Sequence, residues 1–140
     1  IVDKNNIGLE GHSMGGWMTL FSMAVETRLR VGIVSCGFQG LNGVGQYIRP
    51  RPGSTGGPEQ DPGFSRTQLV KDLIAPRSLL IISPTQDDDP EAVRRDVELA
   101  RPSYAMDGRA ECLKLWIPEG RHRFPSDIRA RAYDWLEGWL

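Results

Sequence analysis

Short apolar runs alternate along the chain with longer segments in which apolar residues recur at every third or fourth position. The short runs predict four β-strands, over residues 7–10, 31–35, 78–83 and 113–117. The longer segments predict four helices, over residues 14–26, 66–73, 91–106 and 126–140. A regular alternation of strands and helices is typical of a parallel sheet that is covered by helices. We therefore expect an α/β fold with about four parallel strands and flanking helices.

Two of these helices carry a clear apolar stripe. In the first helix the stripe consists of Met14, Trp17, Met18, Phe21 and Val25. In the last helix, which Ser126 is expected to cap, it consists of Ile128, Ala132, Trp135, Leu136 and Trp139. The tryptophans in these stripes are expected to lie in the core rather than to contact a cofactor.

Charge and composition narrow the choice of partners. The 140 residues include 17 Lys and Arg against 18 Asp and Glu, for a net charge of −1. This balance argues against nucleic acid or an anionic membrane as the main partner. The longest aliphatic run, Leu79 to Ile82, is far too short to span a membrane. Glycine and proline are concentrated in residues 37–64, which predicts a long loop.

The two cysteines, Cys36 and Cys112, are too few for a disulfide framework and lack the spacing of metal ligands. They fall near two strands that flank a third strand. The distance between the cysteines, two strand spacings, is too long for a disulfide, so both are expected to be free thiols. The chain begins with Ile1 rather than Met, and no signal-type segment precedes the first strand. We therefore expect a piece of a longer protein. Its compartment stays open, with the cytoplasm preferred.

A nucleophile motif stands between the first strand and the first helix. Residues 11–15 read Gly-His-Ser-Met-Gly, which matches G-x-S-x-G in the strand-turn-helix setting where that motif has a mechanical meaning. The sharp turn projects the Ser13 hydroxyl above the sheet, and the amide of Met14 is placed to donate to a developing oxyanion. We expect Gly11 and Gly15 to lack side chains because strand and helix approach each other closely there.

A serine nucleophile needs a base, and the chain has two histidines. His12 adjoins Ser13, so its side chain is expected to point away from the hydroxyl. His122 is therefore the candidate base, on a loop at residues 118–125 after the fourth strand. The flanking Arg121 and Arg123 are expected to point outward, because they would otherwise disfavour the imidazolium.

The third member of such a site is a carboxylate that orients the imidazole, and its order in the chain is Ser, acid, His. Asp87, Asp88 and Asp89 follow the third strand, in a loop at residues 84–90. The carboxyl ends of strands are where open α/β sheets place their sites. Asp87 is the preferred acid and Asp88 the second choice, while Asp89 is expected to cap the following helix.

With these positions in place, the chain resembles the C-terminal half of an α/β-hydrolase. More narrowly, it is similar to dienelactone-hydrolase-like and acetyl-xylan-esterase-like serine hydrolases. The matching stretches are residues 2–16, 34–38, 73–77, 83–88, 122–125 and 133–136. The resemblance implies a single partial domain over residues 1–140, with Ser13 as nucleophile, Asp87 as acid and His122 as base.

The departures from that family are informative. Its sheet has about eight strands, and this sequence carries counterparts of the last four. The family's loop for a second oxyanion donor precedes the nucleophile strand and has no counterpart here. Pro90 follows the acid loop early, which leaves Asp87 and Asp88 open, and Arg123 replaces the acidic residue that many relatives carry after the base. The first strand would become a free edge, which invites self-association or pairing with a missing N-terminal half.

These features predict a serine hydrolase that cleaves small carboxylic esters through an acyl-enzyme, without cofactor or metal. One alternative is a serine peptidase of the prolyl-oligopeptidase type, in which a Tyr usually stands where this chain has Met14. The other is a piece that has lost activity with its N-terminal half.

Overall fold

The structure is a computed structural model, and it describes residues 3–38 and 69–140 of the chain. Most of the predicted loop at 37–64 lies outside these residues. The strands are β1 (Ile7–His12), β2 (Leu29–Ser35), β3 (Ser78–Ile82) and β4 (Leu113–Trp116). The helices are α1 (Met14–Val25), the π-helical turn η1 (Leu69–Ile74), α4 (Pro90–Met106), the 3₁₀ turn η2 (Ala110–Cys112) and α5 (Ser126–Glu137).

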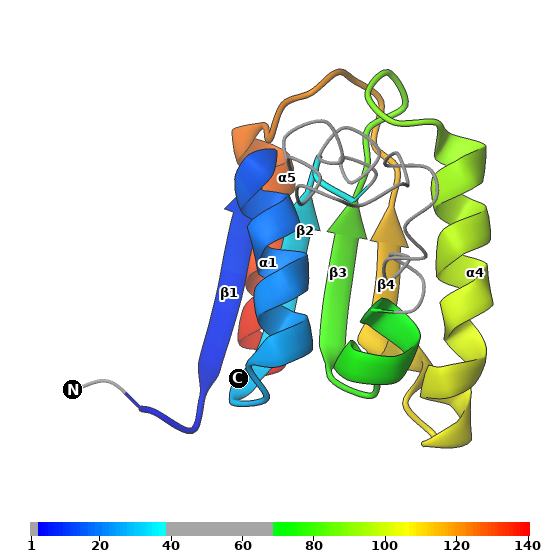
Figure 1. The fold of residues 1–140 in the computed structure, drawn as a ribbon. Helices are drawn as coiled ribbons and strands as arrows, with labels where there is room; N and C mark the ends of the chain where they lie inside the picture. The colour runs from blue at the N-terminus through cyan, green and yellow to red at the C-terminus, as the bar shows by residue number, and fades with distance from the viewer. Residues whose placement is uncertain (1–2, 39–68) are drawn as a thin grey trace, which may run out of the picture.

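The four strands form one parallel sheet in the order β1-β2-β3-β4, so the expected architecture is confirmed. Gly11 pairs with Val34, Val34 with Ile81, and Ile81 with Leu115, which aligns the carboxyl ends of neighbouring strands. In Figure 1 all four arrows point the same way, and the segments that follow β3 and β4 gather above their tips. Loops from different parts of the chain thus meet at one edge of the sheet.

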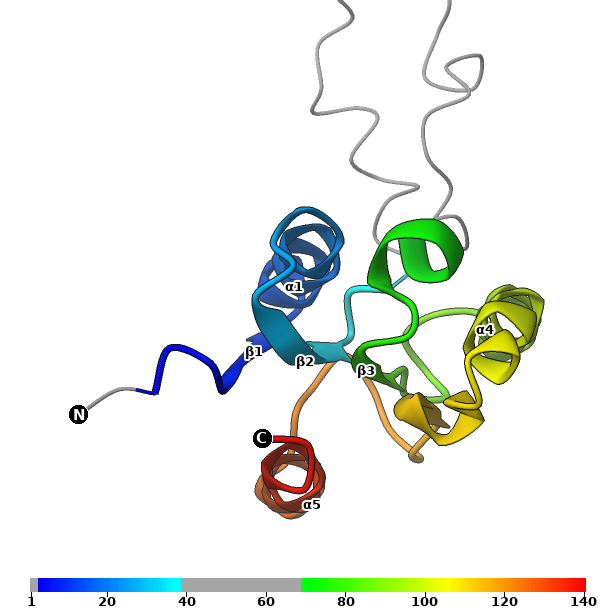
Figure 2. The same cartoon turned by 90° about the horizontal axis from the view of Figure 1, so that it is seen from below.

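The two faces of the sheet are covered unequally. Helices α1 and α4 and the turn η1 lie on one face, and α5 lies alone on the other (Figure 2). Successive strand residues point to opposite faces: Leu79 and Ile81 join the larger cluster, whereas Leu80 and Ile82 join the smaller one beneath α5. Strand β3 is buried on both faces along its whole length.

The apolar stripe predicted for α1 is not its buried face. Met14, Met18 and Val25 are exposed. The residues that face the core are Gly16, Thr19, Leu20, Met23 and Ala24. Both sides of this helix are rich in apolar residues, and the small residue Gly16 lets this side come against the end of β2: a Cβ there would lie 2.7 Å from the Ser35 carbonyl oxygen.

Other expectations differ in detail. The helix predicted at 66–73 is a π-helical turn in its described part, and residues 66–68 lie outside the described residues. Helix α5 has Pro125 at its N-cap position and no side-chain cap, so the prediction that Ser126 caps it is wrong; Ser126 is its first residue. The helix buries Ala132 and half-buries its other apolar stripe residues.

The expectations about the cysteines and about two of the three tryptophans are met, whereas Trp17 is half-buried and belongs to neither core cluster. Cys36 and Cys112 are both buried free thiols. Cys36 directly follows β2 and Cys112 directly precedes β4, and these strands flank β3. Trp135 and Trp139 pack against the core as half-buried side chains. Within the described part of the chain, no helix combines the length and the apolar character that a membrane span requires.

Candidate active site

Ser13 forms the whole turn between β1 and α1. Strand β1 ends at His12 and α1 begins at Met14, so one residue reverses the chain. Its φ of 59° and ψ of −120° lie in a region that residues with a side chain rarely adopt. Such conformations persist only where the surrounding structure enforces them, and they cluster at functional sites.

Close packing around this turn requires glycine at three positions. A Cβ on Gly11 would lie 2.0 Å from the carbonyl oxygen of Gly15, so strand and helix touch there as expected. The same expectation for Gly15 itself is wrong, because a Cβ on Gly15 would meet nothing within 4 Å among the described residues. The other two contact glycines are Gly16 and Gly37. A Cβ on Gly16 would lie 2.7 Å from the carbonyl oxygen of Ser35, and one on Gly37 would lie 2.4 Å from the carbonyl oxygen of Ser13.

The hydroxyl of Ser13 lies 2.7 Å from Nε2 of His122, and Nδ1 of His122 lies 2.7 Å from Oδ1 of Asp87. Because a carboxylate only accepts hydrogen bonds, Nδ1 carries the imidazole proton and Nε2 accepts from the serine hydroxyl. The three side chains come from the turn after β1 and from the loops after β3 and β4, and they form one hydrogen-bonded chain. The sequence-predicted nucleophile, base and acid are thus brought together.

The three neighbouring aspartates have separate partners. Asp87 bonds His122, whereas Asp88 accepts a 3.0 Å hydrogen bond from the buried hydroxyl of Ser83. Asp89 stands at the N-cap of α4 and accepts a 3.1 Å hydrogen bond from the amide of Glu91, as expected. The geometry therefore favours Asp87 over Asp88 as the partner of the imidazole.

His12 contacts the site in a way that the sequence did not reveal. Its ring centroid lies 5.1 Å from that of His122 and 6.1 Å from the ring of Phe124. Its Nδ1 is hydrogen-bonded to Oγ of Ser35 at 3.1 Å. Burial, and then the neighbouring His122, lower the pKa of His12, while Asp87 and Glu10 act in the opposite direction. The lowered pKa favours the uncharged form of the His12 ring, which packs against the candidate base.

Three possible metal ligands meet at the same place. Sγ of Cys36, a carboxylate oxygen of Asp87 and a ring nitrogen of His122 lie within 4.8 Å of one another. Burial, reinforced by the Asp87 charge, raises the pKa of Cys36 to about 12. A metal would bind the thiolate form of this cysteine. Asp87 and His122 are hydrogen-bonded to each other, so that bond already accounts for their closeness, and we assign no metal role to the three groups.

The groups around the nucleophile also bear on oxyanion binding and on charge. Met14 is the first residue of α1, so its amide belongs to the first turn of the helix, where amides lack intrahelical acceptors. Its role as oxyanion donor stays a prediction.

Arg121 and Arg123 are both exposed, and Nε of Arg121 donates a 3.4 Å hydrogen bond to the side-chain oxygen of Gln86.

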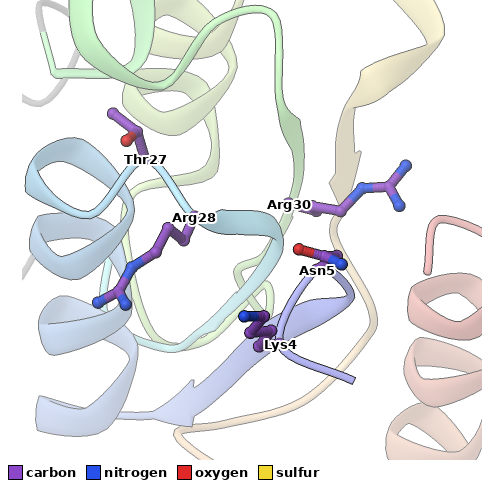
Figure 3. Close-up of a pocket in the computed structure, with 5 residues that line it drawn as sticks. All are labelled: Lys4, Asn5, Thr27, Arg28 and Arg30. Atoms are coloured by element: carbon purple, nitrogen blue, oxygen red, sulfur yellow. The ribbon is translucent and has the colours of Figure 1, made fainter.

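A cationic hollow lies at the opposite end of the sheet, near the start of β1 and β2 (Figure 3). It is lined by Lys4, Asn5, Thr27, Arg28 and Arg30. Arg28 is already paired with a glutamate, Glu26, at 2.6 Å. The residues that line this hollow do not include a hydrogen-bonded nucleophile and base. The candidate active site is therefore placed at the end of the sheet that carries Ser13.

No family model matches this sequence, and no curated protein matches it. Solved structures do match. A carbohydrate esterase family 15 glucuronoyl esterase from Caldicellulosiruptor kristjansonii superposes with a TM-score of 0.80 and 19% identity, over 99% of this chain and 44% of that one. For a glucuronoyl esterase from Solibacter usitatus the values are 0.75 and 16%, over 99% of this chain and 43% of that one.

An esterase from Pyrococcus furiosus matches with a TM-score of 0.65 and 17% identity, over 96% of this chain and 54% of that one. The chain thus spans less than half the length of the two glucuronoyl esterases. At these identities the likeness concerns the fold alone. The described part of the chain therefore has the fold of the matched part of these esterases.

Proposed function

We propose that the protein is a serine hydrolase that cleaves carboxylic esters through an acyl-enzyme. The observation that carries this proposal is the continuous hydrogen-bonded chain from Ser13 through His122 to Asp87, with both bonds at 2.7 Å. Its nucleophile occupies a strained single-residue turn at the start of a helix. The α/β-hydrolase fold, which the matched esterases share, supports the same reaction class.

In the proposed reaction, Oγ of Ser13 attacks the ester carbonyl carbon while Nε2 of His122 takes the hydroxyl proton. Asp87 holds the imidazole in the required tautomer and stabilises the imidazolium that forms. The amide of Met14 donates a hydrogen bond to the oxyanion. His122 then returns the proton to the departing alcohol, which leaves Ser13 acylated.

The second half of the reaction regenerates the serine. Water attacks the acyl carbon as His122 takes its proton, and the proton passes to Oγ of Ser13 when the carboxylic acid leaves. Protein groups and water supply every atom and proton, so the proposed route needs neither cofactor nor metal.

The substrate proposed is a small-molecule ester. Two of the matched structures are named glucuronoyl esterases, so a methyl ester of glucuronic acid belongs in the substrate panel beside p-nitrophenyl acetate. A p-nitroanilide peptide with proline before the scissile bond tests the peptidase alternative. Faster cleavage of that peptide than of the esters would overturn the ester assignment.

The decisive experiment is intact-mass analysis after treatment with a fluorophosphonate, run beside Ser13→Ala and His122→Asn. We expect one adduct on the natural chain, none on the serine variant and a strongly slowed reaction on the histidine variant. No adduct on a chain shown to be folded would favour the inactive-piece alternative, since a single oxyanion donor can be worth about 10²–10³ in rate. Adding the N-terminal half of a longer form in trans would then test whether activity returns.

A further inference from the structure

The loop that carries the candidate acid and the loop that carries the candidate base are tied together by one exposed carboxylate. Glu119 follows β4 and stands three residues before His122. Its Oε2 accepts a 3.1 Å hydrogen bond from the hydroxyl of Thr85, and its Oε1 accepts a 2.9 Å bond from the side-chain amide of Gln86. Thr85 and Gln86 directly precede Asp87.

Backbone bonds run alongside these contacts. The amide of Thr85 donates to the carbonyl of Pro118 at 3.0 Å, and the amide of Gln86 donates to the carbonyl of Gly120 at 2.8 Å. The Thr85 hydroxyl in turn accepts a 3.3 Å bond from the amide of Gly120. The pairing of β3 with β4 is therefore continued into their loops by a short ladder, with the Glu119 carboxylate along its side.

Burial does little to fix the position of the His122 side chain. Its side chain is 49% exposed, whereas that of Asp87 is 13% exposed. The Asp87–His122 bond joins the two loops. Glu119 joins the same two loops close to that bond, because it lies in the loop of His122 and bonds the two residues that precede Asp87. A displacement of about 1 Å in such a constellation can cost about 10²-fold in rate.

We propose that Glu119 is a positioning residue that sets the distance between Asp87 and His122. The carboxylate suits this role because it offers two acceptors to two donors that come from consecutive residues. It touches neither the nucleophile nor the reacting atoms, so it acts through the loops. The kinetic part of this inference rests on the proposed hydrolase function, whereas the geometric part does not.

The test compares Glu119→Ala, Glu119→Gln and the exchange variant Glu119→Gln/Gln86→Glu. In the exchange, a carboxylate at position 86 accepts from an amide at position 119, so donor and acceptor trade places while the charge is kept. Glu98→Ala is the matched control, because Glu98 is an exposed glutamate that pairs with Arg101 at 2.7 Å in the middle of α4.

Two readouts are measured on each folded variant. The first is fluorophosphonate labelling, resolved into the maximal rate and the half-saturating concentration. We expect Glu119→Ala to lower the maximal rate about 10- to 100-fold with little change in the half-saturating concentration, Glu119→Gln to fall between, and the exchange variant to recover most of the loss. The control should label like the natural chain.

The second readout is the low-field proton resonance of the His122 Nδ1–H, which reports its bond to Asp87 whether or not the chain is active. We expect it in the natural chain, the exchange variant and the control, and we expect it broadened or lost in Glu119→Ala. Unchanged labelling and an unchanged resonance in Glu119→Ala would overturn the proposal, as would the absence of the resonance from the natural chain. If the natural chain shows the resonance but no labelling, the hydrolase proposal fails and the resonances of the variants alone decide the role of Glu119. Should Glu119→Ala not fold, Glu119→Gln against its exchange variant gives the same decision.

Discussion

The amide of Ser13 donates a 2.8 Å hydrogen bond to the carbonyl oxygen of Ser35, the last residue of β2. The carbonyl of Ser13 accepts a 3.1 Å bond from the amide of Trp17 in α1. Both backbone polar groups of the turn are therefore satisfied, one by the neighbouring strand and one by the helix. These bonds hold Ser13 at its φ of 59°. The neighbouring strand and helix therefore keep the residue in a strained conformation.

Replacing Ser13 separates this strain from the hydroxyl. Ser13→Ala and Ser13→Gly both remove the nucleophile, but only glycine adopts a positive φ without cost. We expect Ser13→Gly to be the more stable of the two by about 1 kcal/mol, the usual strain of such a residue less the greater flexibility of unfolded glycine. Urea unfolding of the two variants measures the difference, and equal midpoints would show that the turn carries no strain.

The glycines of the motif differ in what an alanine would meet. Gly11→Ala forces a Cβ against the Gly15 carbonyl at 2.0 Å, so the strand or the helix must move. We expect this variant to lose several kcal/mol or to fail to fold. Gly15→Ala meets nothing within 4 Å among the described residues, and alanine is about 1 kcal/mol better than glycine inside a helix. Thermal unfolding should therefore place Gly15→Ala at or above the natural chain, and a large loss there would contradict the packing described.

His12 makes stability depend on pH. Because burial lowers its pKa in the folded chain, the unfolded chain binds a proton on His12 near pH 6.5 that the folded chain does not bind. The free energy of unfolding therefore falls as the pH drops from 7.5 through 6.5 toward the lowered folded pKa.

Urea midpoints at pH 7.5 and 5.5 check this dependence. His12→Asn places a side-chain amide close to where Nδ1 meets Ser35 but has no proton to gain. We expect the natural chain to lose more stability between the two pH values than this variant does. An equal loss in both proteins would assign the pH dependence to other groups.

Arg77 ties the end of α1 to the start of β3. Its guanidinium donates to four backbone carbonyls, which belong to Met23, Glu26, Leu29 and Leu73. Lysine keeps the charge but cannot reproduce this fork of donors. We expect Arg77→Lys to lower the free energy of unfolding by about 1–3 kcal/mol, measured by urea unfolding.

The matched control for Arg77 is Arg94→Lys, in an exposed pair with Glu91 at 3.6 Å. Exposed pairs of this kind contribute about 0–1 kcal/mol, so the control should change little. Similar effects of the two substitutions would mean that the carbonyl contacts of Arg77 do not stabilise the fold.

The free edge of β1 leads to a proposal about association. Among the described residues β1 pairs only with β2, and Met14, Met18 and Val25 on the adjoining α1 are exposed. We propose that the 140-residue chain, prepared alone, self-associates through this side. Light scattering over a concentration series should show oligomers, and Met18→Lys/Val25→Lys should shift them toward monomer. A stable, monodisperse natural monomer would refute the proposal.

The strands, and the order of serine, acid and histidine along the chain, were predictable because each depends on local signals. The apolar run at residues 78–83 and the Gly-His-Ser-Met-Gly turn specify what forms without reference to distant residues. The buried face of α1 was not predictable in the same way. That helix is apolar on two sides, and the choice between them follows from the contact between Gly16 and Ser35, which exists only after β1 and β2 have paired.

The contacts around the base escaped prediction for a related reason. Glu119, Thr85 and Gln86 are ordinary polar loop residues in the sequence, and their roles depend on the register between two loops that are 33 or more residues apart. The sequence assigned His12 no role beyond a side chain that points away from the Ser13 hydroxyl, yet its ring lies against that of His122. Periodicity and motifs describe neighbours along the chain, whereas these contacts arise from strand order.

The unequal cover of the sheet has a consequence for how the site is lost. Among the described residues, the cluster beneath α5 has four buried members, against sixteen in the cluster on the other face. We therefore expect helix α5 to detach at a lower free energy than the helices on the other face. The loop that carries His122 leads directly into this helix. Its amides should exchange their hydrogens by sub-global opening, ahead of those in β2 and β3. We therefore expect low concentrations of denaturant to separate His122 from Ser13 before the sheet unfolds, because His122 moves away together with the helix.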